Sequence, residues 1–411
     1  MSRTSLKILV VVIIAVSGIA GAVLWFASYF IGLVFVGLAL ILFFVHKRLS
    51  VKADNDYRGE LRKQISTLLI PLAGIVIAVI IGGILMLATG YDPWAAYKAL
   101  FYGGFVKNWH VSVLNSVPLM FTGLSIALAF KAGLFNIGAE GQYYVGAMAA
   151  TFLGIYLKLP GILAIPIIFI VSAAVAGAYN FIPALLKVKT GAHEVITTMM
   201  FAHIARYLSS IFIRGMGGDP NTSKHAYVTW PILESSELPR FQQFLPNANY
   251  RVHMGIIIAI AVAFLVYYFL RYTKYGFEIR AVGHNPLASR TQGISVSANV
   301  YRSLLMAGML AGLAGVTQIV GLDHKFFENL NAGYGWNGIS VALLASNHPI
   351  GVIFTSLLWG ALDAGGQYMA RTEQTPNAIV EIIKGIILFL VVARYIYSYL
   401  GNRLRRKKAL V

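Results

Sequence analysis

Residues 161–183 read GILAIPIIFIVSAAVAGAYNFIP, an apolar run without a single charged side chain. A helix needs about 20 mainly apolar residues to cross the hydrocarbon core of a bilayer. Runs of this length recur along the 411-residue chain. The sequence therefore predicts an all-α, polytopic membrane protein with about 10–12 transmembrane segments, one of them a short or re-entrant helix.

The composition supports the same class. Hydrophobic residues make up 58% of the chain and charged residues only 12%, whereas soluble domains contain about 25% charged residues. The net charge of +18 could suggest a nucleic-acid partner, but the basic residues cluster in short loops and at the C-terminus, as in membrane proteins. No nucleic-acid partner is expected. The absence of cysteine excludes disulfides, Cys-zinc sites and thiol chemistry.

The apolar runs give the order of the expected spans. The first run starts like a signal peptide, but it is too long for the apolar region of one and is interpreted as a retained span. A shorter run, WNGISVALLAS at 336–346, is too brief for a comfortable crossing and predicts the short helix. The expected full-length spans lie near 8–27, 29–45, 66–88, 112–130, 140–157, 161–183, 195–213, 254–272, 302–322, 350–370 and 379–397.

Basic residues predict the orientation. The linker HKRLSVKADNDYRGELRKQ, residues 46–64, and the tail NRLRRKK are expected in the cytoplasm, because positive charge favours that side. Both requirements hold only if 336–346 counts as a crossing, which gives about twelve segments with both termini cytoplasmic. Residues 1–64 are interpreted as an appended transmembrane hairpin with a charged linker, and 401–411 as a basic cytoplasmic tail.

No motif for an energy source or a catalytic centre occurs in the sequence. The phosphate-binding loop G-x-x-x-x-G-K-[ST] is absent, as are H-E-x-x-H and G-x-S-x-G. An enzyme is therefore not expected, and uphill transport would need an ion gradient or another subunit. An ion-coupled carrier would use ionisable residues inside its spans, although Glu381 and Lys384, spaced i,i+3, can satisfy each other. The candidates for such a carrier are Glu140, Glu194, His203, Arg206, Asp363, Glu381 and Lys384.

Residues 133–150, GLFNIGAEGQYYVGAMAA, place polar groups and four glycines among apolar spans. Irregular backbone at membrane depth is tolerated only where protein buries it or a wet cavity borders it. The stretch is therefore interpreted as part of a pore wall or gate. Asn136 and Gln142 are expected to contact substrate. Glu140 is expected to anchor the break by accepting backbone N–H bonds near a helix start.

The basic loop 275–302 contains a short amphipathic stretch, Pro286–Thr291. A proline near a helix start and a glycine past its end, here Gly293, predict a helix of about two turns. Such a helix could be a passive connector or a lever moved by a soluble partner. In the next span, Gly308 and Gly312 stand four residues apart, a spacing that lets helix backbones approach closely.

Four motifs in this order resemble a known family. GHNPLASRTQGI at 283–294, followed by GMLAGLAG at 308–315, is similar to the coupling loop of permease subunits of ATP-binding-cassette importers. The matching class is the ribose, branched-chain amino acid and nucleoside type. FNIGAEGQ at 135–142 looks like the branch that handles nucleosides and related simple sugars.

Two further motifs support the same branch. TGAHEVITTMM at 190–200 resembles its G-x-N-E-V-I segment. GYGWNGISVALLASNHPIGVI at 333–353 resembles its G-[FY]-G-[FWY]-x-[GA]-I-A-V-A-L-L-[GA] segment. Departures from the pattern are His193, where asparagine is common, and Ser340, where alanine is common. An imidazole titrates near neutral pH and an amide does not, so the resemblance constrains the substrate weakly. It covers about residues 65–400, which are interpreted as the permease domain.

The resemblance implies a nucleoside importer subunit in a bacterial-type cytoplasmic membrane, with a simple sugar such as ribose as the alternative cargo. It also implies a cytoplasmic ATPase, a second and different permease, and an extracytoplasmic binding lipoprotein. No cofactor is expected in this chain, because ATP and magnesium would bind the ATPase. The expected substrate-pathway residues are Asn136, Gln142, His193, Thr197, Thr198, Trp336 and Asn337. The expected structural or gating residues are Gly138, Glu140, Gly141 and Glu194. The expected ATPase-coupling residues are Gly283, Asn285, Pro286, Ala288, Ser289, Gly293 and Ile294.

Overall fold

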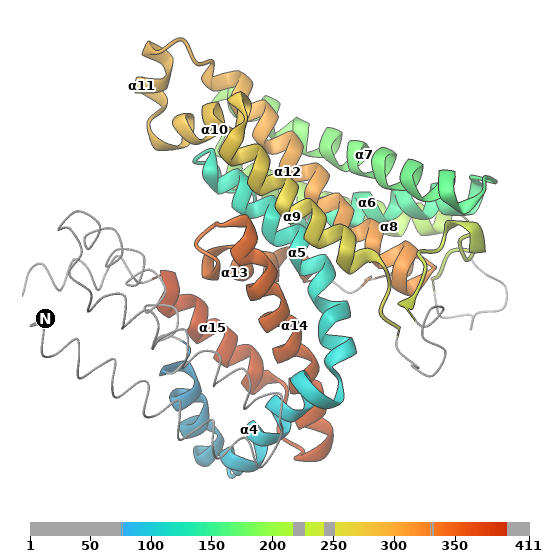
Figure 1. The fold of residues 1–411 in the computed structure, drawn as a ribbon, viewed down its shortest axis with the longest axis vertical. Coiled ribbons are helices and arrows are strands. Elements are labelled where there is room, and N and C mark those ends of the chain that lie inside the picture. The colour runs from blue at the N-terminus through green and yellow to red at the C-terminus, as the bar shows by residue number, and fades with distance from the viewer. Residues whose placement is uncertain are drawn as a thin grey trace, which may run out of the picture. The chain divides into compact units, whose positions relative to one another are not determined.

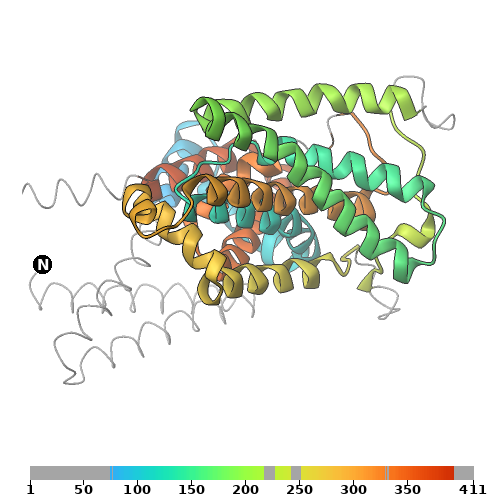
Figure 2. The ribbon, with the colours of Figure 1, turned by 90° about the horizontal axis from the view of Figure 1, so that it is seen from above.

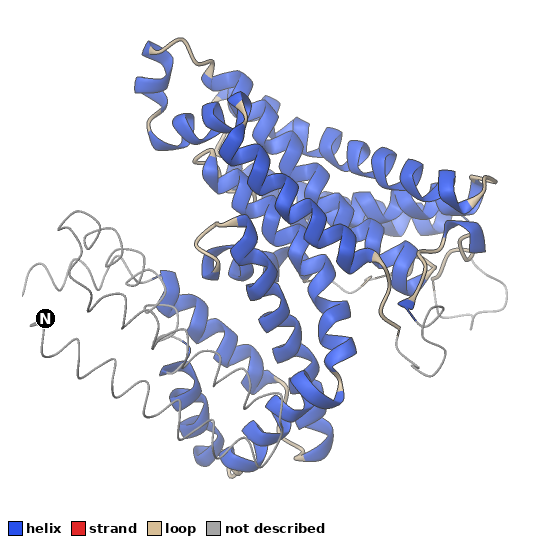
Figure 3. Ribbon diagram, viewed as in Figure 1, coloured by secondary structure: helices blue, strands red, loops and turns tan. Residues whose placement is uncertain are grey.

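The computed structural model describes residues 75, 77–216, 227–241, 251–328, 330 and 333–392. Within these residues the chain is helical, and its β-type pairing consists of two isolated bridges (Figures 1 and 3). The predicted hairpin and linker at 1–64, including the spans 8–27 and 29–45, lie outside the described residues, as does the tail 401–411.

The described residues form two compact units. The larger unit covers His110–Ala361 and the smaller one combines the flanking parts of the chain. The helices of the larger unit are α5 (Trp109–Lys131), α6 (Ala139–Tyr156), α7 (Gly161–Thr190), α8 (Glu194–Met216), α9 (Gly255–Tyr272), α10 (Lys274–His284), α11 (Pro286–Thr291), α12 (Val296–Gln318), the π-helical turn η4 (Ile319–Asp323), α13 (Tyr334–Leu344) and the first half of α14 (Pro349–Thr372). The smaller unit contains Ile77–Ala88, α4 (Pro93–Phe101), η1 (Tyr102–Lys107), the end of α14 and α15 (Ala378–Val392).

Six of the described helices are long and apolar enough to cross a membrane, namely α5, α7, α8, α9, α12 with η4, and α14. They coincide with the spans predicted near 112–130, 161–183, 195–213, 254–272, 302–322 and 350–370. The prediction of an all-α, multi-pass membrane protein is confirmed. The predicted short helix at 336–346 is present as α13.

Two helices extend beyond the predicted spans. α7 continues through Pro183 to Thr190 and ends at Gly191, whose φ of 72° is left-handed. The predicted end at 183 was wrong because proline is tolerated within membrane helices. α12 begins at Val296 instead of 302, since the Ser295 side chain accepts a hydrogen bond from the backbone of Ala298 and caps the helix.

The core of the larger unit is the contact of α6, α7 and α12, which run side by side (Figures 1 and 2). Glycine makes this contact possible. A Cβ atom on Gly146 would lie 2.3 Å from the carbonyl oxygen of Gly312, and one on Gly308 would lie 2.8 Å from the carbonyl oxygen of Ala176. The predicted close packing at Gly308 and Gly312 is therefore confirmed.

Replacing Gly315 in this core with alanine is expected to lower the free energy of unfolding by about 1–3 kcal/mol. The new Cβ atom would lie 2.1 Å from the carbonyl oxygen of Tyr143, so the two helices must separate. Gly385→Ala is the matched control, because nothing lies within 4 Å of its new Cβ atom. It should stabilise α15 by up to about 1 kcal/mol. Thermal unfolding of the purified protein in nanodiscs measures both; equal melting temperatures would contradict the packing argument.

Candidate translocation site

The carboxylate of Glu140 is the centre of the site. Although Glu140 stands in the first turn of α6, its side chain reaches α13: Oε1 accepts from the Gly333 N–H at 2.6 Å and Oε2 from the Gly335 N–H at 2.7 Å. The Trp336 N–H also donates to this carboxylate, which is 5% exposed. Glu140 thus satisfies backbone donors that a helix start leaves without intrahelical partners. Acceptance of backbone N–H bonds was predicted, but the helix that Glu140 caps lies about 195 residues further along the chain.

Small residues let α13 begin against α6. A Cβ atom on Gly335 would lie 2.2 Å from the Glu140 nitrogen, and one on Gly338 would lie 2.5 Å from the Thr122 hydroxyl oxygen. That hydroxyl donates to the Tyr334 carbonyl at 3.0 Å. The start of α13 is therefore fixed by α5 on one side and by α6 on the other.

The two predicted amides, Asn136 and Gln142, form a closed pair. The Asn136 Nδ2 group donates to Gln142 Oε1 at 2.9 Å, and the Gln142 Nε2 group donates to Asn136 Oδ1 at 3.0 Å. Asn136 also donates to the Ser125 hydroxyl at 3.2 Å, and both amides are buried. In this conformation the pair holds the turn before α6 in place. Contact with substrate stays a prediction that requires the pair to open.

Aromatic side chains surround the break in a cluster that was not predicted. Tyr143 lies 5.9 Å from Tyr334 and 5.7 Å from Tyr144, measured between ring centroids. Tyr144 lies 6.5 Å from Phe326, which precedes α13 in the chain. The only sequence signal was the tyrosine pair in GQYY, directly after Glu140. These rings connect α6 to the start of α13 and to the segment that precedes α13 in the chain.

One face of α8 carries exposed polar groups beside the break. The side chains of His203 and Arg206 are exposed. The positive charge of Arg206 attracts the Glu140 carboxylate. Trp336 is 40% exposed and Asn337 is half-buried. An arginine at the centre of a membrane costs about 2.5–3.5 kcal/mol when it faces lipid. This face therefore suits a watery pathway or a protein neighbour better than lipid.

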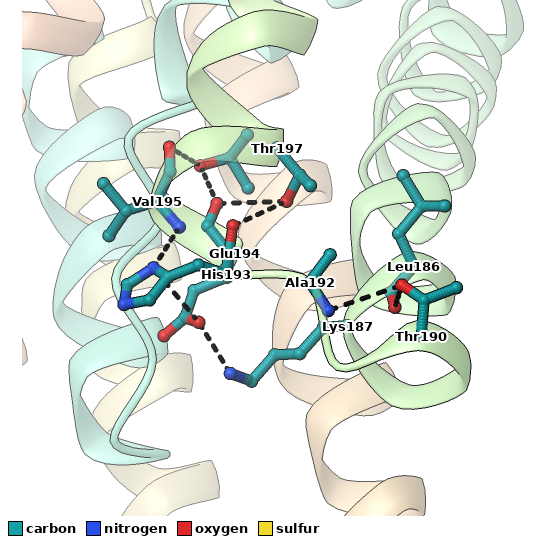
Figure 4. Close-up of polar contacts among 9 residues, drawn as sticks. Leu186, Lys187, Thr190, Ala192, His193, Glu194, Val195 and Thr197 are labelled. Carbon is teal, nitrogen blue, oxygen red and sulfur yellow. Dashed lines mark hydrogen bonds and ion pairs between the residues drawn. The ribbon is translucent and has the colours of Figure 1, made fainter.

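The start of α8 holds the other predicted pathway residues (Figure 4). Lys187 donates to Glu194 at 2.6 Å, and the Val195 N–H donates to His193 Nδ1 at 3.3 Å. The His193 ring is mostly exposed. The Thr197 hydroxyl donates to the His193 carbonyl at 3.3 Å and Thr197 is half-buried, whereas Thr198 is fully buried. His193 and Thr197 can therefore face a solute without rearrangement, and Thr198 cannot.

The predicted structural glycines join α6 to α8. A Cβ atom on Gly138 would lie 2.9 Å from the Thr198 carbonyl oxygen, and one on Gly141 would lie 2.6 Å from the Ala202 Cα atom. Larger residues would push the start of α6 away from α8. The break and the start of α8 consequently form one packed site.

The short helix α11 spans Pro286–Thr291, the residues predicted from the proline and glycine signals. The Asn285 side chain caps it by accepting from the backbone of Leu287 at 3.0 Å and of Ala288 at 3.1 Å. Leu287 is 79% exposed, whereas Ser289 is buried against its own chain. Ser289 therefore offers little to a partner, whereas Leu287, which the sequence analysis did not single out, presents an exposed apolar side chain.

A cavity of about 720 Å³ lies between α10 and α11. Its wall is mainly apolar, with a few polar and ionisable side chains at the rim. The residues that line this cavity include Lys274, Glu278, His284, Asn285, Ala288 and Ile294.

The backbone of α10 also contacts the turn that follows α5. A Cβ atom on Gly283 would lie 2.1 Å from the Lys131 carbonyl oxygen and 2.9 Å from the Gly133 nitrogen.

At the opposite end of α12, histidines fix the loop 227–241. The guanidinium of Arg240 donates to His324 Nε2, and the Gly255 N–H donates to His253 Nδ1 at 3.1 Å. Burial lowers the pKa of both histidines to about 4, with the Arg240 charge adding to the effect. Both rings are therefore neutral in the folded protein at neutral pH.

Acidification is expected to loosen this loop. The unfolded histidines take up protons near pH 6.5, but the folded ones do so only near pH 4, so stability is lost as the pH falls through that window, by about 1–3 kcal/mol. Groups facing the rings are Arg240, Glu237 at 3.6 Å from His324, Asp323 and Arg251. Hydrogen exchange of 227–241 should rise between about pH 7.5 and about pH 5.5 after correction for intrinsic rates. His324→Gln, which keeps an acceptor for Arg240, should weaken that dependence; an unchanged one would contradict the assignment.

Residues 111–392 match the family model for the permease component of branched-chain amino acid transport systems. The guanosine ABC transporter permease NupP of Bacillus subtilis is 35% identical over 84% of this chain and 99% of its own length. The glucose permease TsgB13 of Haloferax volcanii is 32% identical over 80% and 88%. The nucleoside permease NupB of Lactococcus lactis is 32% identical over 83% and 95%. Two more distant permease relatives are NupQ of Bacillus subtilis, at 23% identity, and NupC of Lactococcus lactis, at 25% identity. Each match covers 69% of this chain and 90% of the relative's length.

Proposed function

The chain belongs to the permease-component family of branched-chain amino acid transport systems, and on that premise we propose that it forms the translocation pathway of an ABC importer for nucleosides. It is a multi-pass protein of the cytoplasmic membrane. The observation that carries the choice of cargo is the similarity to a guanosine permease and a nucleoside permease over most of the chain. A simple sugar is the second candidate, because a glucose permease is also 32% identical.

The site has the chemistry that such a cargo requires. A nucleoside is uncharged, has one flat base and carries several hydroxyl groups, so it needs aromatic faces, amides and hydroxyls. Trp336, Asn337, His193 and Thr197 supply these groups and are at least partly exposed. In this proposal Glu140 holds the start of α13 and takes no part in bonding the cargo.

Three partners complete the proposed importer. A cytoplasmic ATPase would supply the energy, with ATP and magnesium bound there, so this chain itself would have no enzymatic activity. An extracytoplasmic protein would deliver the cargo. The paired relatives, NupP with NupQ and NupB with NupC, support a second and different permease subunit in the pore.

Movement of α11 would open and close the pathway. When the ATPase closes on ATP, it would displace α11 and with it α10. Gly283 touches the backbone of the turn that follows α5, so the displacement would reach α6 and Glu140 directly. The site would then open alternately to the two sides of the membrane.

Reconstitution tests the proposal. The chain is co-expressed with a candidate ATPase, second permease and binding protein, and uptake of labelled guanosine and uridine is followed in proteoliposomes. Uptake should require ATP and every subunit. Uptake by this chain alone that is lost when an ion gradient collapses would instead identify a secondary carrier. Uptake of labelled ribose or glucose, with no uptake of either nucleoside, would identify the sugar transporter.

A further inference from the structure

The start of α13 contacts Thr122 in α5, a helix able to cross a membrane, and it is already capped by a side chain of this protein. The N-terminus of a helix carries partial positive charge and free N–H donors, and it readily binds anions. In transporters with interrupted helices, such an end can hold the negative group of the cargo. Here the Glu140 carboxylate accepts hydrogen bonds from Gly333, Gly335 and Trp336 and is itself buried.

Both oxygens of Glu140 accept from N–H donors, which is the bonding pattern of an ionised carboxylate. Its negative charge offsets the partial positive charge of the helix end. Arg206 contributes the opposite full charge from the exposed face of α8 and attracts Glu140. The break therefore carries one side-chain charge of each sign.

The exposed side chains at the start of α13 are uncharged. Trp336 presents an indole that is 40% exposed, and Asn337 follows it on the same first turns of α13. An indole face stacks on a flat ring, and an amide both donates and accepts hydrogen bonds. The surface suits a neutral, flat and polar solute.

We propose that Glu140 determines specificity for uncharged solutes: it fills the anion site at the start of α13 and so excludes phosphorylated forms of the cargo from the pathway. This inference rests on the proposed function, since it concerns the same pathway. Removing the charge of Glu140 would leave the positive end of α13 without its anionic partner. An anion would then bind at the break and block transport.

The test uses the whole importer in nanodiscs, with both faces accessible. ATPase activity stimulated by the binding protein is measured at saturating nucleoside, with uridine 5′-monophosphate added as the anionic probe. The wild type should show no inhibition up to the highest probe concentration, and Glu140→Gln should be half-inhibited at a concentration about tenfold below that limit. Activity without the binding protein controls for an effect of the probe on the ATPase itself.

Matched variants separate charge from structure. Glu194→Gln removes another largely buried carboxylate, one paired with Lys187, and should remain insensitive to the probe. Glu140→Asp keeps the charge and should also remain insensitive, even if its activity falls. In Glu140→Gln combined with Arg206→Gln, the gained inhibition should decrease.

Each outcome bears on one idea. If nucleoside with the binding protein does not stimulate the ATPase activity of the wild type, the proposed function fails. If it does, but Glu140→Gln gains no inhibition, or gains no more than Glu194→Gln, only the specificity role of Glu140 is overturned. If Glu140→Gln cannot be purified, the wild type still decides, because inhibition of the wild type by the monophosphate at saturating nucleoside would overturn the proposal.

Discussion

Leu287→Asp is expected to abolish coupling between this permease and its ATPase. Leu287 projects from a helix of six residues that is capped at its start by Asn285, and its side chain is 79% exposed. A hot-spot residue at the centre of a protein interface costs about 2 kcal/mol or more when truncated, and Leu287 is proposed as one, so a buried aspartate in its place should weaken ATPase binding by about 30-fold or more. Co-purification of the tagged ATPase and nucleoside uptake measure the effect.

A second apolar surface residue provides the control. Ile162 is even more exposed than Leu287. It stands in the first turn of α7, whereas α8 follows the last turn of that helix. Ile162→Asp adds the same charge and should leave ATPase binding unchanged. Normal ATPase association and uptake in Leu287→Asp would show that α11 is a passive connector, the alternative interpretation of the sequence.

Glu140→Ala is expected to give the second large effect, on both stability and transport. The substitution leaves three backbone N–H groups at the start of α13 without their acceptor. Each unsatisfied buried donor costs about 1–3 kcal/mol, so a loss of at least about 3 kcal/mol in the free energy of unfolding is expected. Uptake should fall below detection, because α13 carries Trp336 and Asn337.

Glu381→Ala is the comparison for that loss. Glu381 also accepts a hydrogen bond, from Lys384 at 2.9 Å, but it is 54% exposed, and Lys384 keeps Asp363 as a partner. The expected change is below about 1 kcal/mol. Thermal unfolding in nanodiscs compares the two variants, and a similar small change in both would show that α13 does not depend on Glu140.

Local signals predicted the helices well. Long apolar runs marked the spans because the bilayer demands them, and Pro286 with Gly293 marked α11 to the residue, because proline and glycine act on their own turn of the backbone. The expected i,i+3 pair of Glu381 and Lys384 is confirmed for the same reason. Such signals need no knowledge of the rest of the fold.

The contacts of the site depend on segments far apart in the chain, and the sequence could not predict them. Nothing near Glu140 indicates that its acceptors serve Gly333 and Gly335, or that Asn136 and Gln142 bond to each other. The direction of Leu287 is set by how α11 packs. Residue types predicted which groups matter at the break, but only tertiary packing determines which of them remain available to a solute.

The contact at Gly283 has a mechanical consequence. Backbone meets backbone there, at distances that leave no room for a Cβ atom, so α10 and the turn at Gly133 touch at this point through atoms that cannot change rotamer. A joint without rotamers has little slack and stores little conformational entropy. A displacement of α11 should therefore be transmitted to the start of α6 with little loss of amplitude, and to nearly the same extent at every temperature.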